Sequence, residues 1–380
     1  MEKGIDPRPL YSLLDWFGDV EDPRIDRKKL YPLDEILLLT VCAVMSGLHE
    51  WDEIVDFGQI KLAWLKKYRP FENGIPSHDT LNRVIGLVNY QDFEAFFSIW
   101  ASGFAGSLSG KLVNIDGKKL RGSVNKMEQQ ISKKEGGKSA IHLVEAWCSE
   151  LNLCLGQVKT DTKSNEITAI PDLLDMLELS GSIVTIDAMG CQKTIASKIV
   201  EKEADYILAL KRNHETLYDE VIKLFDNEVL TNESVQENKG HGRFETRVCR
   251  VILASRLPDS INWTGLKNFV EIYSERTIIT SKEQTSEFRY YLTSLDMTAE
   301  NLNQLIRQHW GIENKLHWAM DVQFQEDSSR KRQSNAAQNF AILRRCVLNL
   351  LKSFPEKISV NRKISKCAIS DEYREKILDF

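Results

Sequence analysis

Apolar and polar positions over the first hundred residues recur with the spacing of amphipathic helices. The apolar run Ile36–Leu48 is long enough for a buried helix, and Trp51–Tyr68 repeats apolar residues at helical spacing. Ser77 suits the N-cap of a further helix. We therefore predict an all-α domain over residues 1–105. The helices on either side of the Asn73–Pro76 turn are candidates for a DNA-reading pair, although a plain helical bundle gives the same pattern more often.

After Gly110 the pattern changes to short apolar strands. Lys111–Ile115 predicts a strand that ends at Asp116-Gly117, followed by a loop rich in glycine and lysine. Further strands are expected at Ala140–Cys148, Leu153–Lys159, Ser182–Ile186 and Tyr206–Leu210, with helices at Ile167–Leu179 and Gln192–Glu203. This order is that of a ribonuclease H-like domain. We predict an α/β fold with a ribonuclease H-like mixed sheet core over residues 106–212 and 296–354.

The rest of the chain is expected to form an insertion, a long helix and a tail. Alternating patterns predict a small antiparallel sheet inserted at residues 213–295, with strands at Glu245–Leu253, Phe269–Ile279 and Phe288–Leu295. Lys239–Arg243 at its entrance is expected to be a flexible basic loop. A helix is predicted from Ser334, and the tail at 355–380 is expected to be poorly ordered.

Two aspartates follow strands of the predicted core. Asp116 follows the first strand and Asp187 the fourth, and small residues come after each. The predicted topology places these two strands side by side, and ligands of open α/β sheets gather at the carboxyl ends of strands. For either aspartate alone, a helix cap or a turn is the commoner role. The pair, together with an acid from a later helix, is a much more specific signal.

The third acid is expected to be Glu313. A helix beginning near Ala299 would place His309, Glu313, His317 and Asp321 four residues apart along one polar face. A surface helix with solvated acids is the plain alternative. A zinc site of His309, Glu313 and His317 is another alternative, but it leaves the two aspartates without a role.

Three converging carboxylates are ligands typical of Mg²⁺ or Mn²⁺. Two such ions, about 3.5–4 Å apart, serve phosphodiester chemistry by activating the attacking oxygen and stabilising the leaving one. We expect Asp116 to bridge both ions, with Asp187 and Glu313 holding one each. DNA-binding or supporting roles are predicted for a set of basic and polar residues: His309, Asn314, His317, Asp321, Lys118, Arg121, Lys211, Asn213, His241, Arg243, Arg330 and Arg332.

Composition narrows the class of protein. The seven cysteines are scattered and never form a Cys-x-x-Cys pair, which fits reduced thiols better than disulfides or a zinc knot. The N-terminus is polar, and the longest apolar run is too short to span a bilayer. A cytoplasmic protein without a membrane partner is therefore expected.

The formal net charge of −5 counts against a nucleic-acid partner, because phosphate-binding proteins usually carry a basic excess. However, local patches of charge, and not totals, set the field that a ligand feels. The basic residues here are clustered at Arg24–Lys29, Lys66–Arg69, Lys118–Lys126, Lys211-Arg212, Arg330–Arg332 and Arg344-Arg345.

Three motifs surround the candidate acids: Asn114–Lys118, Thr185–Gly190 and His309–Asp327. Together they resemble the DDE-type insertion-sequence transposases, specifically the H-repeat-associated group found with Rhs elements. Further landmarks of that group match at Asp22–Arg24, Tyr31–Leu33, Gly74–Thr80 and His241–Arg243.

The resemblance implies a ribonuclease H-like core, metal-dependent strand cleavage at element ends, and strand transfer into target DNA. A homodimer is expected in the DNA complex, because two element ends must be held together. Related transposases carry a tyrosine, an arginine and a lysine around the glutamate, where this chain has Ile306, His309 and Met320. Two alternatives stay open: a ribonuclease H-like DNA endonuclease or recombination factor without transposition, and a catalytically inactive DNA-binding protein.

Overall fold

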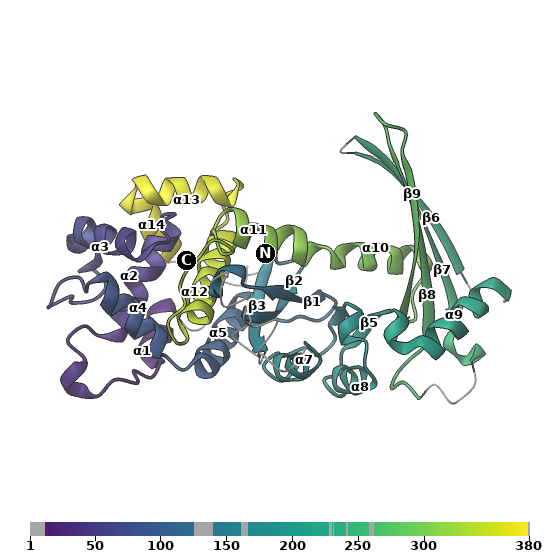
Figure 1. Cartoon of the computed structure of the whole chain (residues 1–380), viewed down its shortest axis with the longest axis horizontal. Helices are drawn as coiled ribbons and strands as arrows, with labels where there is room; N and C mark the ends of the chain where they lie inside the picture. The colour runs from purple at the N-terminus through teal and green to yellow at the C-terminus, as the bar shows by residue number, and fades with distance from the viewer. Residues whose placement is uncertain are drawn as a thin grey trace, which may run out of the picture. The chain divides into compact units, whose positions relative to one another are not determined.

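The computed structural model describes residues 12–124, 140–160, 166–227, 230, 232–240, 242–257 and 262–378 (Figure 1). The chain divides into two compact units. The first unit comprises Met1–Ser107, Gly117–Leu177 and Glu313–Phe380, and the second comprises Leu108–Asp116 and Glu178–Ile312. Strand β1 (Leu112–Lys119) contributes residues to both units.

The first unit begins with the helices that the sequence pattern predicted. They are α1 (Leu13–Asp19), α2 (Leu33–Met45), α3 (Trp51–Leu65), α4 (His78–Leu87) and α5 (Tyr90–Ala105). Helix α2 is almost entirely buried, as its apolar run indicates. The Ser77 side chain accepts a hydrogen bond from the Thr80 N–H, which confirms it as the N-cap of α4. Trp16 packs in stacked geometry on Phe93 and Trp100, with centroids 5.4 Å away in both pairs.

The same unit holds an antiparallel hairpin of β2 (His142–Cys148) and β3 (Leu153–Thr160), as predicted. Helices α7 (Glu166–Asp175), α5 and α12 (Ala336–Ser353) pack against β3. Helix α12 is buried along nearly its whole length.

The expected disorder of the tail is wrong, because the chain continues as α13 (Val360–Ile369) and α14 (Asp371–Leu378). The tail is polar in sequence, and the residue that anchors it, Arg374, is itself charged. The Arg374 side chain is fully buried, and its guanidinium lies 5.3 Å from the centroid of Phe57 and 4.7 Å from that of Trp64. A cation over two aromatic rings of α3 therefore holds the tail in place.

The second unit is built on parallel strands. Strand β1 pairs in parallel with β4 (Ile183–Ile186), and β4 pairs in parallel with β5 (Asp205–Leu210). Helix α8 (Lys193–Glu201) packs against β5. The predicted adjacency of the first and fourth strands is therefore confirmed. The predicted end of β1 at Asp116 is wrong, because the strand continues through Gly117 to Lys119.

The predicted antiparallel strands of the insertion are present as β7 (Arg243–Leu253), β8 (Asn268–Ile278) and β9 (Gln284–Thr293). Helix α9 (Glu215–Asn227) and edge strand β6 (Asn232–Gly240) were not predicted. The inserted strands are not a separate sheet, since β9 pairs with β5. The sheet has nine strands in the order β3-β2-β1-β4-β5-β9-β8-β7-β6.

A flexible basic loop was expected at Lys239–Arg243, but Lys239 and Gly240 belong to β6 and pair with Phe244 and Arg243 of β7. Helix α10 (Ala299–His309) packs against β6 and β7. The order β1, β2, β3, α7, β4, α8, β5 follows the predicted order of elements. The finer assignment to a ribonuclease H-like core stays a prediction.

The single helix expected from Ala299 to Asp321 is wrong. After α10 the chain forms a π-helical turn, η6 (Ile312–His317), and then a short helix, α11 (Trp318–Val322). The four candidate residues therefore fall in three elements: His309 ends α10, Glu313 and His317 belong to η6, and Asp321 belongs to α11. Their surroundings differ accordingly.

All seven cysteines are free and buried, as expected for reduced thiols. Within the described ranges, no helix combines the length and the apolar character needed to cross a membrane.

Candidate active site

The two strand aspartates occupy neighbouring positions in the second unit. Ile115 and Ile186 are the last partners in the parallel register of β1 and β4. Asp116 is the next residue of β1, and Asp187 follows β4 directly in extended conformation, as the N-cap of the 3₁₀ turn η3 (Ala188–Gly190). Neighbouring strands lie about 4.8 Å apart and side chains alternate between faces, so both carboxylates belong to one face of the sheet. Asp187 is held by the Met189 N–H, which donates to its Oδ1 at 3.0 Å.

Two buried polar residues, Asn114 and Thr185, lie on the same face of the sheet as the two aspartates. Asn114 and Thr185 are register partners, two residues before the aspartates. The Thr185 hydroxyl donates to Asn114 Oδ1 at 2.8 Å and lies 2.9 Å from His309 Nδ1. Asn114 Nδ2 donates to the Gln308 carbonyl at 3.2 Å. These contacts fix the C-terminal end of α10 on the face that carries the two carboxylates.

His309 therefore has a positioning role. Burial, with a contribution from Arg289, lowers the pKa of His309 to about 4. The ring is neutral near pH 7 and offers no positive charge to a phosphate. The sequence analysis missed Asn114 and Thr185. The available signal was their place two residues before each aspartate, which puts them on the same face of a strand.

The end of the next strand, β5, supports the loop after Asp187. The Asn213 side chain donates to the Ala188 carbonyl at 2.8 Å, and His214 Nε2 lies 2.6 Å from the Cys191 carbonyl. Lys211 is exposed immediately after β5. Asn213 is therefore a support of the aspartate loop, and Lys211 is a solvent-accessible cation at the same end of the parallel strands.

Glu313, the third predicted acid, is exposed on η6 and belongs to the first unit. Its approach to Asp116 and Asp187 stays a prediction. The turn that carries it is anchored at its other end, where His317 Nε2 lies 3.1 Å from Glu145 Oε2. Asn314 is also exposed on η6.

Glu145 belongs to a buried cluster of charges within the first unit. Arg345 Nε donates to Glu145 Oε1 at 2.5 Å, and its two terminal nitrogens pair with Glu326. Burial by itself raises the pKa of Glu145, but the Arg345 guanidinium and His317 outweigh burial and hold that pKa below its usual range. The pKa of Glu326 is also lowered, because Arg345 outweighs its burial.

Lys118 extends this cluster to η6 and α11. Its ammonium lies 2.5 Å from Asp321 Oδ1 and 3.8 Å from Glu326 Oε2, and it donates to the His317 carbonyl at 3.4 Å. Because Lys118 is buried, its charge is neutralised inside the protein. Of the two roles expected for Lys118 and Asp321, DNA contact or support of the site, their ion pair favours support.

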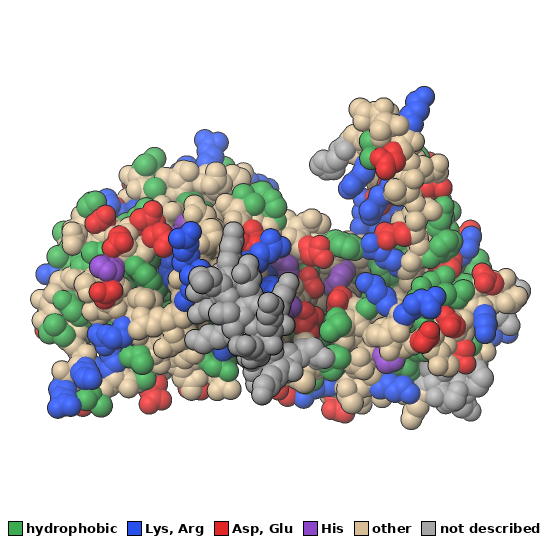
Figure 2. Space-filling model, in the orientation of Figure 1, with side chains coloured by type: hydrophobic (Ala, Val, Ile, Leu, Met, Phe, Trp, Pro, Cys, Tyr) green, Lys and Arg blue, Asp and Glu red, His purple; other side chains and the backbone are tan. Residues whose placement is uncertain are grey.

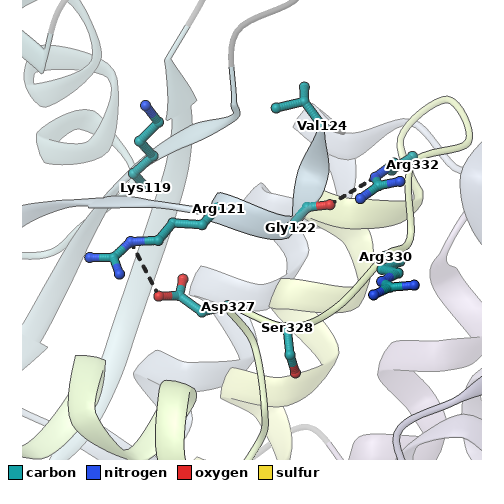
Figure 3. Close-up of a pocket in the computed structure, with 8 residues that line it drawn as sticks. All are labelled: Lys119, Arg121, Gly122, Val124, Asp327, Ser328, Arg330 and Arg332. Carbon is teal, nitrogen blue, oxygen red and sulfur yellow. Dashed lines mark hydrogen bonds and ion pairs between the residues drawn. The ribbon is translucent and has the colours of Figure 1, made fainter. Parts of the chain in front are cut away.

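The expected basic patch at Arg344-Arg345 is also wrong, since both side chains are buried. Three other predicted DNA-binding residues, Arg121, Arg330 and Arg332, come together around one pocket of the first unit (Figure 3). Arg243 is exposed at the start of β7. Figure 2 shows Lys and Arg side chains over the part of the molecule that holds the β6–β9 strands. His241 lies outside the described residues.

The donor set fits hard cations only in part. Asp116 and Asp187 offer neighbouring oxygen ligands of the kind that Mg²⁺ and Mn²⁺ prefer. Among the residues described, no group of three or more His, Cys, Asp or Glu side chains is arranged to hold a metal ion.

Comparison with known families defines the class of protein. The Transposase DDE domain matches residues 109–350, and the DDE_Tnp_1-associated domain matches residues 14–101. The chain belongs to the DDE transposase family, and it is a transposase.

Individual relatives narrow this class. "Putative transposase YncI" from Escherichia coli O157:H7 is 43% identical over 383 residues, covering 97% of this chain and 95% of the relative. "H repeat-associated putative transposase YhhI" from Escherichia coli K12 is 40% identical over 386 residues, covering 97% and 98%. The predicted resemblance to the H-repeat-associated group is confirmed. A solved piggyBac transposase synaptic complex with hairpin DNA matches at 12% identity and a TM-score of 0.43, and the match covers 96% of this chain and 78% of the solved one.

Proposed function

We propose that this transposase cuts DNA at the ends of a mobile element and joins the cut strand to target DNA, with Asp116, Asp187 and Glu313 as ligands of divalent cations. The observation that carries the proposal is the register of β1 and β4, which puts two carboxylates on neighbouring strands and one face. When bound, Mg²⁺ or Mn²⁺ ions would activate the attacking oxygen and stabilise the leaving oxygen.

The residues of this chain have separate tasks in the proposed reaction. Asp116 and Asp187 supply the fixed half of the ligand set from the rigid sheet. The contact of His309 with Thr185 ties α10 to that sheet, and Glu313 follows His309 by four residues in the sequence. We propose that Glu313 completes the ligand set from η6. A π-turn at this position agrees with the frequent occurrence of such turns at functional sites.

The substrate is proposed to be double-stranded DNA, and the DNA complex is proposed to contain two copies of this chain, one for each element end. The N-terminal helices are proposed to contribute to DNA contact. The core that carries the aspartates is proposed to be ribonuclease H-like, on the basis of the order of its strands and helices.

The test is nicking of a plasmid that carries the gene with several hundred base pairs of flanking DNA on each side, in Mg²⁺ or Mn²⁺. Asp116→Asn, Asp187→Asn and Glu313→Gln should each lower the nicking rate on the order of 10²–10³-fold, since a metal supplies several kcal/mol to such reactions. Asp172→Asn, which changes an exposed acid of α7, is the matched control. Equal rates for wild type and Asp187→Asn would refute the proposal.

The same assay separates transposition from simple cutting. A transposase joins the flanking DNA ends to a second plasmid, whereas a nuclease leaves only nicked and linear products. Absence of joined products in an enzyme that cuts would favour the alternative of a DNA endonuclease.

A further inference from the structure

A pocket of about 760 Å³ in the first unit is lined by four cations and one acid. Figure 3 shows Lys119 and Arg121 on one side and Arg330 and Arg332 on the other, with Asp327 near the floor. Lys119 is the last residue of β1, and Arg121 begins the short 3₁₀ turn η2 (Arg121–Ser123) that follows. The others come from the segment between α11 and α12.

Most of the positive charge in this pocket is not neutralised. Arg121 Nε lies 3.4 Å from Asp327 Oδ2, and this is the pocket's one ion pair among the described residues. Arg332 donates to the Gly122 carbonyl, at 3.0 Å, and forms no ion pair with a described residue. Lys119 and Arg330 make no ion pair or hydrogen bond with any side chain in the described ranges. A cavity with this charge balance attracts an anion.

The two walls of the pocket are held at a fixed separation. A Cβ atom at Gly122 would collide with the carbonyl oxygen of Ser329 and approach that of Asp327, so only glycine allows the two backbones this close. The contact from Arg332 to the Gly122 carbonyl joins the same two segments. The cations are therefore displayed from a defined scaffold.

A buried lysine between the two exposed arginines anchors the second wall. The Lys331 ammonium donates to the His49 carbonyl at 2.6 Å and lies 4.7 Å from the ring centroid of Trp51 and 4.3 Å from that of Phe340. Burial, with Arg344 nearby, lowers the pKa of Lys331 to about 8. With Lys331 directed inward, its neighbours Arg330 and Arg332 are directed outward and are exposed.

We propose that this pocket binds a phosphate group of the DNA substrate, so the inference rests on the proposed function. Its lining includes arginines, whose forked guanidinium groups suit phosphate oxygens. None of its described lining residues is aromatic or carries an amide, so these residues neither stack a base nor read a base edge. The contact is therefore independent of sequence and positions the DNA strand.

The test is the salt dependence of binding to a fluorescent 30-base-pair duplex from the flanking DNA, measured by anisotropy in EDTA. Because each phosphate contact contributes about 0.9 to the slope of log K against log salt, Arg330→Ala with Arg332→Ala should lower the slope by about 0.9, and Arg330→Ala alone should lower it by a measurable part of that amount. Affinity of the double variant should fall on the order of 10- to 100-fold at about 0.1 M salt.

Two further variants serve as controls: one is expected to strengthen DNA binding and the other to leave it unchanged. Asp327→Asn removes the acid that pairs with Arg121, and it should tighten binding at low salt. Arg362→Ala removes an exposed arginine from α13, outside the pocket, and it should leave the slope unchanged. Circular dichroism melting of each variant reports whether the fold is intact, and Arg330, with no partner to lose, is the safest position.

Two sources of phosphate are separated by the duplex used. A preference for a 5′-phosphate over a 5′-hydroxyl end that disappears in Arg330→Ala assigns the pocket to a terminal phosphate. Weaker binding to a duplex with internal methylphosphonates, with no effect of the end, assigns it to the DNA backbone. A slope in both arginine variants equal to that of Arg362→Ala, or no DNA binding by the wild type, would overturn the proposal.

This experiment is independent of catalysis, because it is run without metal. If the arginine variants change the slope while Asp187→Asn still nicks at the wild-type rate, the phosphate pocket stands and the proposed active site fails. If Asp187→Asn abolishes nicking while the salt-dependence slope is the same with and without Arg330 and Arg332, the phosphate-pocket proposal is refuted and the proposed active site stands.

Discussion

Removing the Arg345 guanidinium from the buried charge cluster is expected to destabilise the first unit more than almost any other single change. Arg345 is fully buried on α12, and it pairs with Glu145 of β2 and with Glu326, both also buried. Arg345→Met keeps much of the side-chain volume but leaves two buried carboxylates without their main counter-ion. Glu145 also holds His317 at the end of η6, so the change loosens the turn that carries Glu313.

The magnitude follows from the cost of an uncompensated buried charge. Breaking a buried ion pair by removing one partner typically costs about 3–5 kcal/mol. Arg345→Met should therefore lower the free energy of unfolding by about 3–5 kcal/mol near pH 7. The triple variant with Glu145→Gln and Glu326→Gln removes the orphaned charges, and it should recover more than about 1 kcal/mol of that loss. Arg362→Met on exposed α13 is the control, with an effect within about 0.5 kcal/mol.

The free energy of unfolding should change with pH in opposite directions in the wild type and in Arg345→Met. In the wild type the pKa values of Glu145 and Glu326 lie below those of the unfolded chain. Their contribution is therefore fully present above the unfolded value of about 4.3, and it is lost as the pH falls through the folded values. Without Arg345, burial raises both pKa values above the unfolded ones. The stability of the variant should then fall as the pH rises from 5 to 8.

The assay is urea unfolding followed by tryptophan fluorescence and circular dichroism at pH 5 and pH 8. The expected result is a loss that is larger at pH 8 than at pH 5. A loss below about 1 kcal/mol, equal at both pH values, would refute the reasoning, because buried carboxylates that lose their main counter-ion must show both effects.

Three further changes test single features of the fold and site. Gly122→Ala should lower the free energy of unfolding by about 1–3 kcal/mol in urea titrations, because its Cβ meets the Ser329 carbonyl; an unchanged midpoint would contradict the close approach. Thr185→Val removes the hydroxyl between Asn114 and His309, and it should slow single-turnover nicking without weakening duplex binding in anisotropy; a loss confined to binding would contradict its positioning role. Because the folded pKa of His309 is lowered to about 4, its contribution to stability is present above the unfolded value of about 6.5 and is lost as the pH falls toward 4. His309→Asn should therefore weaken the loss of stability between pH 7 and pH 5, and an unchanged pH profile would count against a buried neutral ring.

The sequence predicts those parts of the fold in which one local pattern is decisive. The apolar run of α2, the hairpin of β2 and β3, and the alternating strands β7, β8 and β9 are all present. The adjacency of β1 and β4 followed from the order of elements, and it positions Asp116 and Asp187. Local hydrophobic periodicity and topology were sufficient for these features.

The sequence does not show which charged side chains are buried in the folded protein. Lys118, Arg344 and Arg345 have the pattern of a basic surface, yet each is buried against acids from other elements. The partner of Arg345, Glu145, lies 200 positions away in the chain. No local pattern carries such a pairing, because the contact depends on tertiary packing.

The same limit applies to the turn that carries Glu313 and to the phosphate pocket. A regular four-residue spacing predicted an unbroken helix from Ala299, and the π-turn that interrupts it has no clear signature in the sequence. The sequence marked Arg121, Arg330 and Arg332 as candidates for DNA contact. Their meeting around one cavity depends on the close backbone approach at Gly122.

The central claim is that the two strand aspartates and Glu313 share one divalent-cation site. Fe²⁺ replaces Mg²⁺ in such sites and, with ascorbate and peroxide, cleaves the polypeptide beside the bound ion. Mapping those cuts in the DNA complex should show breaks next to Asp116, Asp187 and Glu313 together, all suppressed by excess Mg²⁺ and by Asp187→Asn. Cuts beside the aspartates without a cut beside Glu313, or cuts that Asp187→Asn leaves unchanged, would contradict the claim.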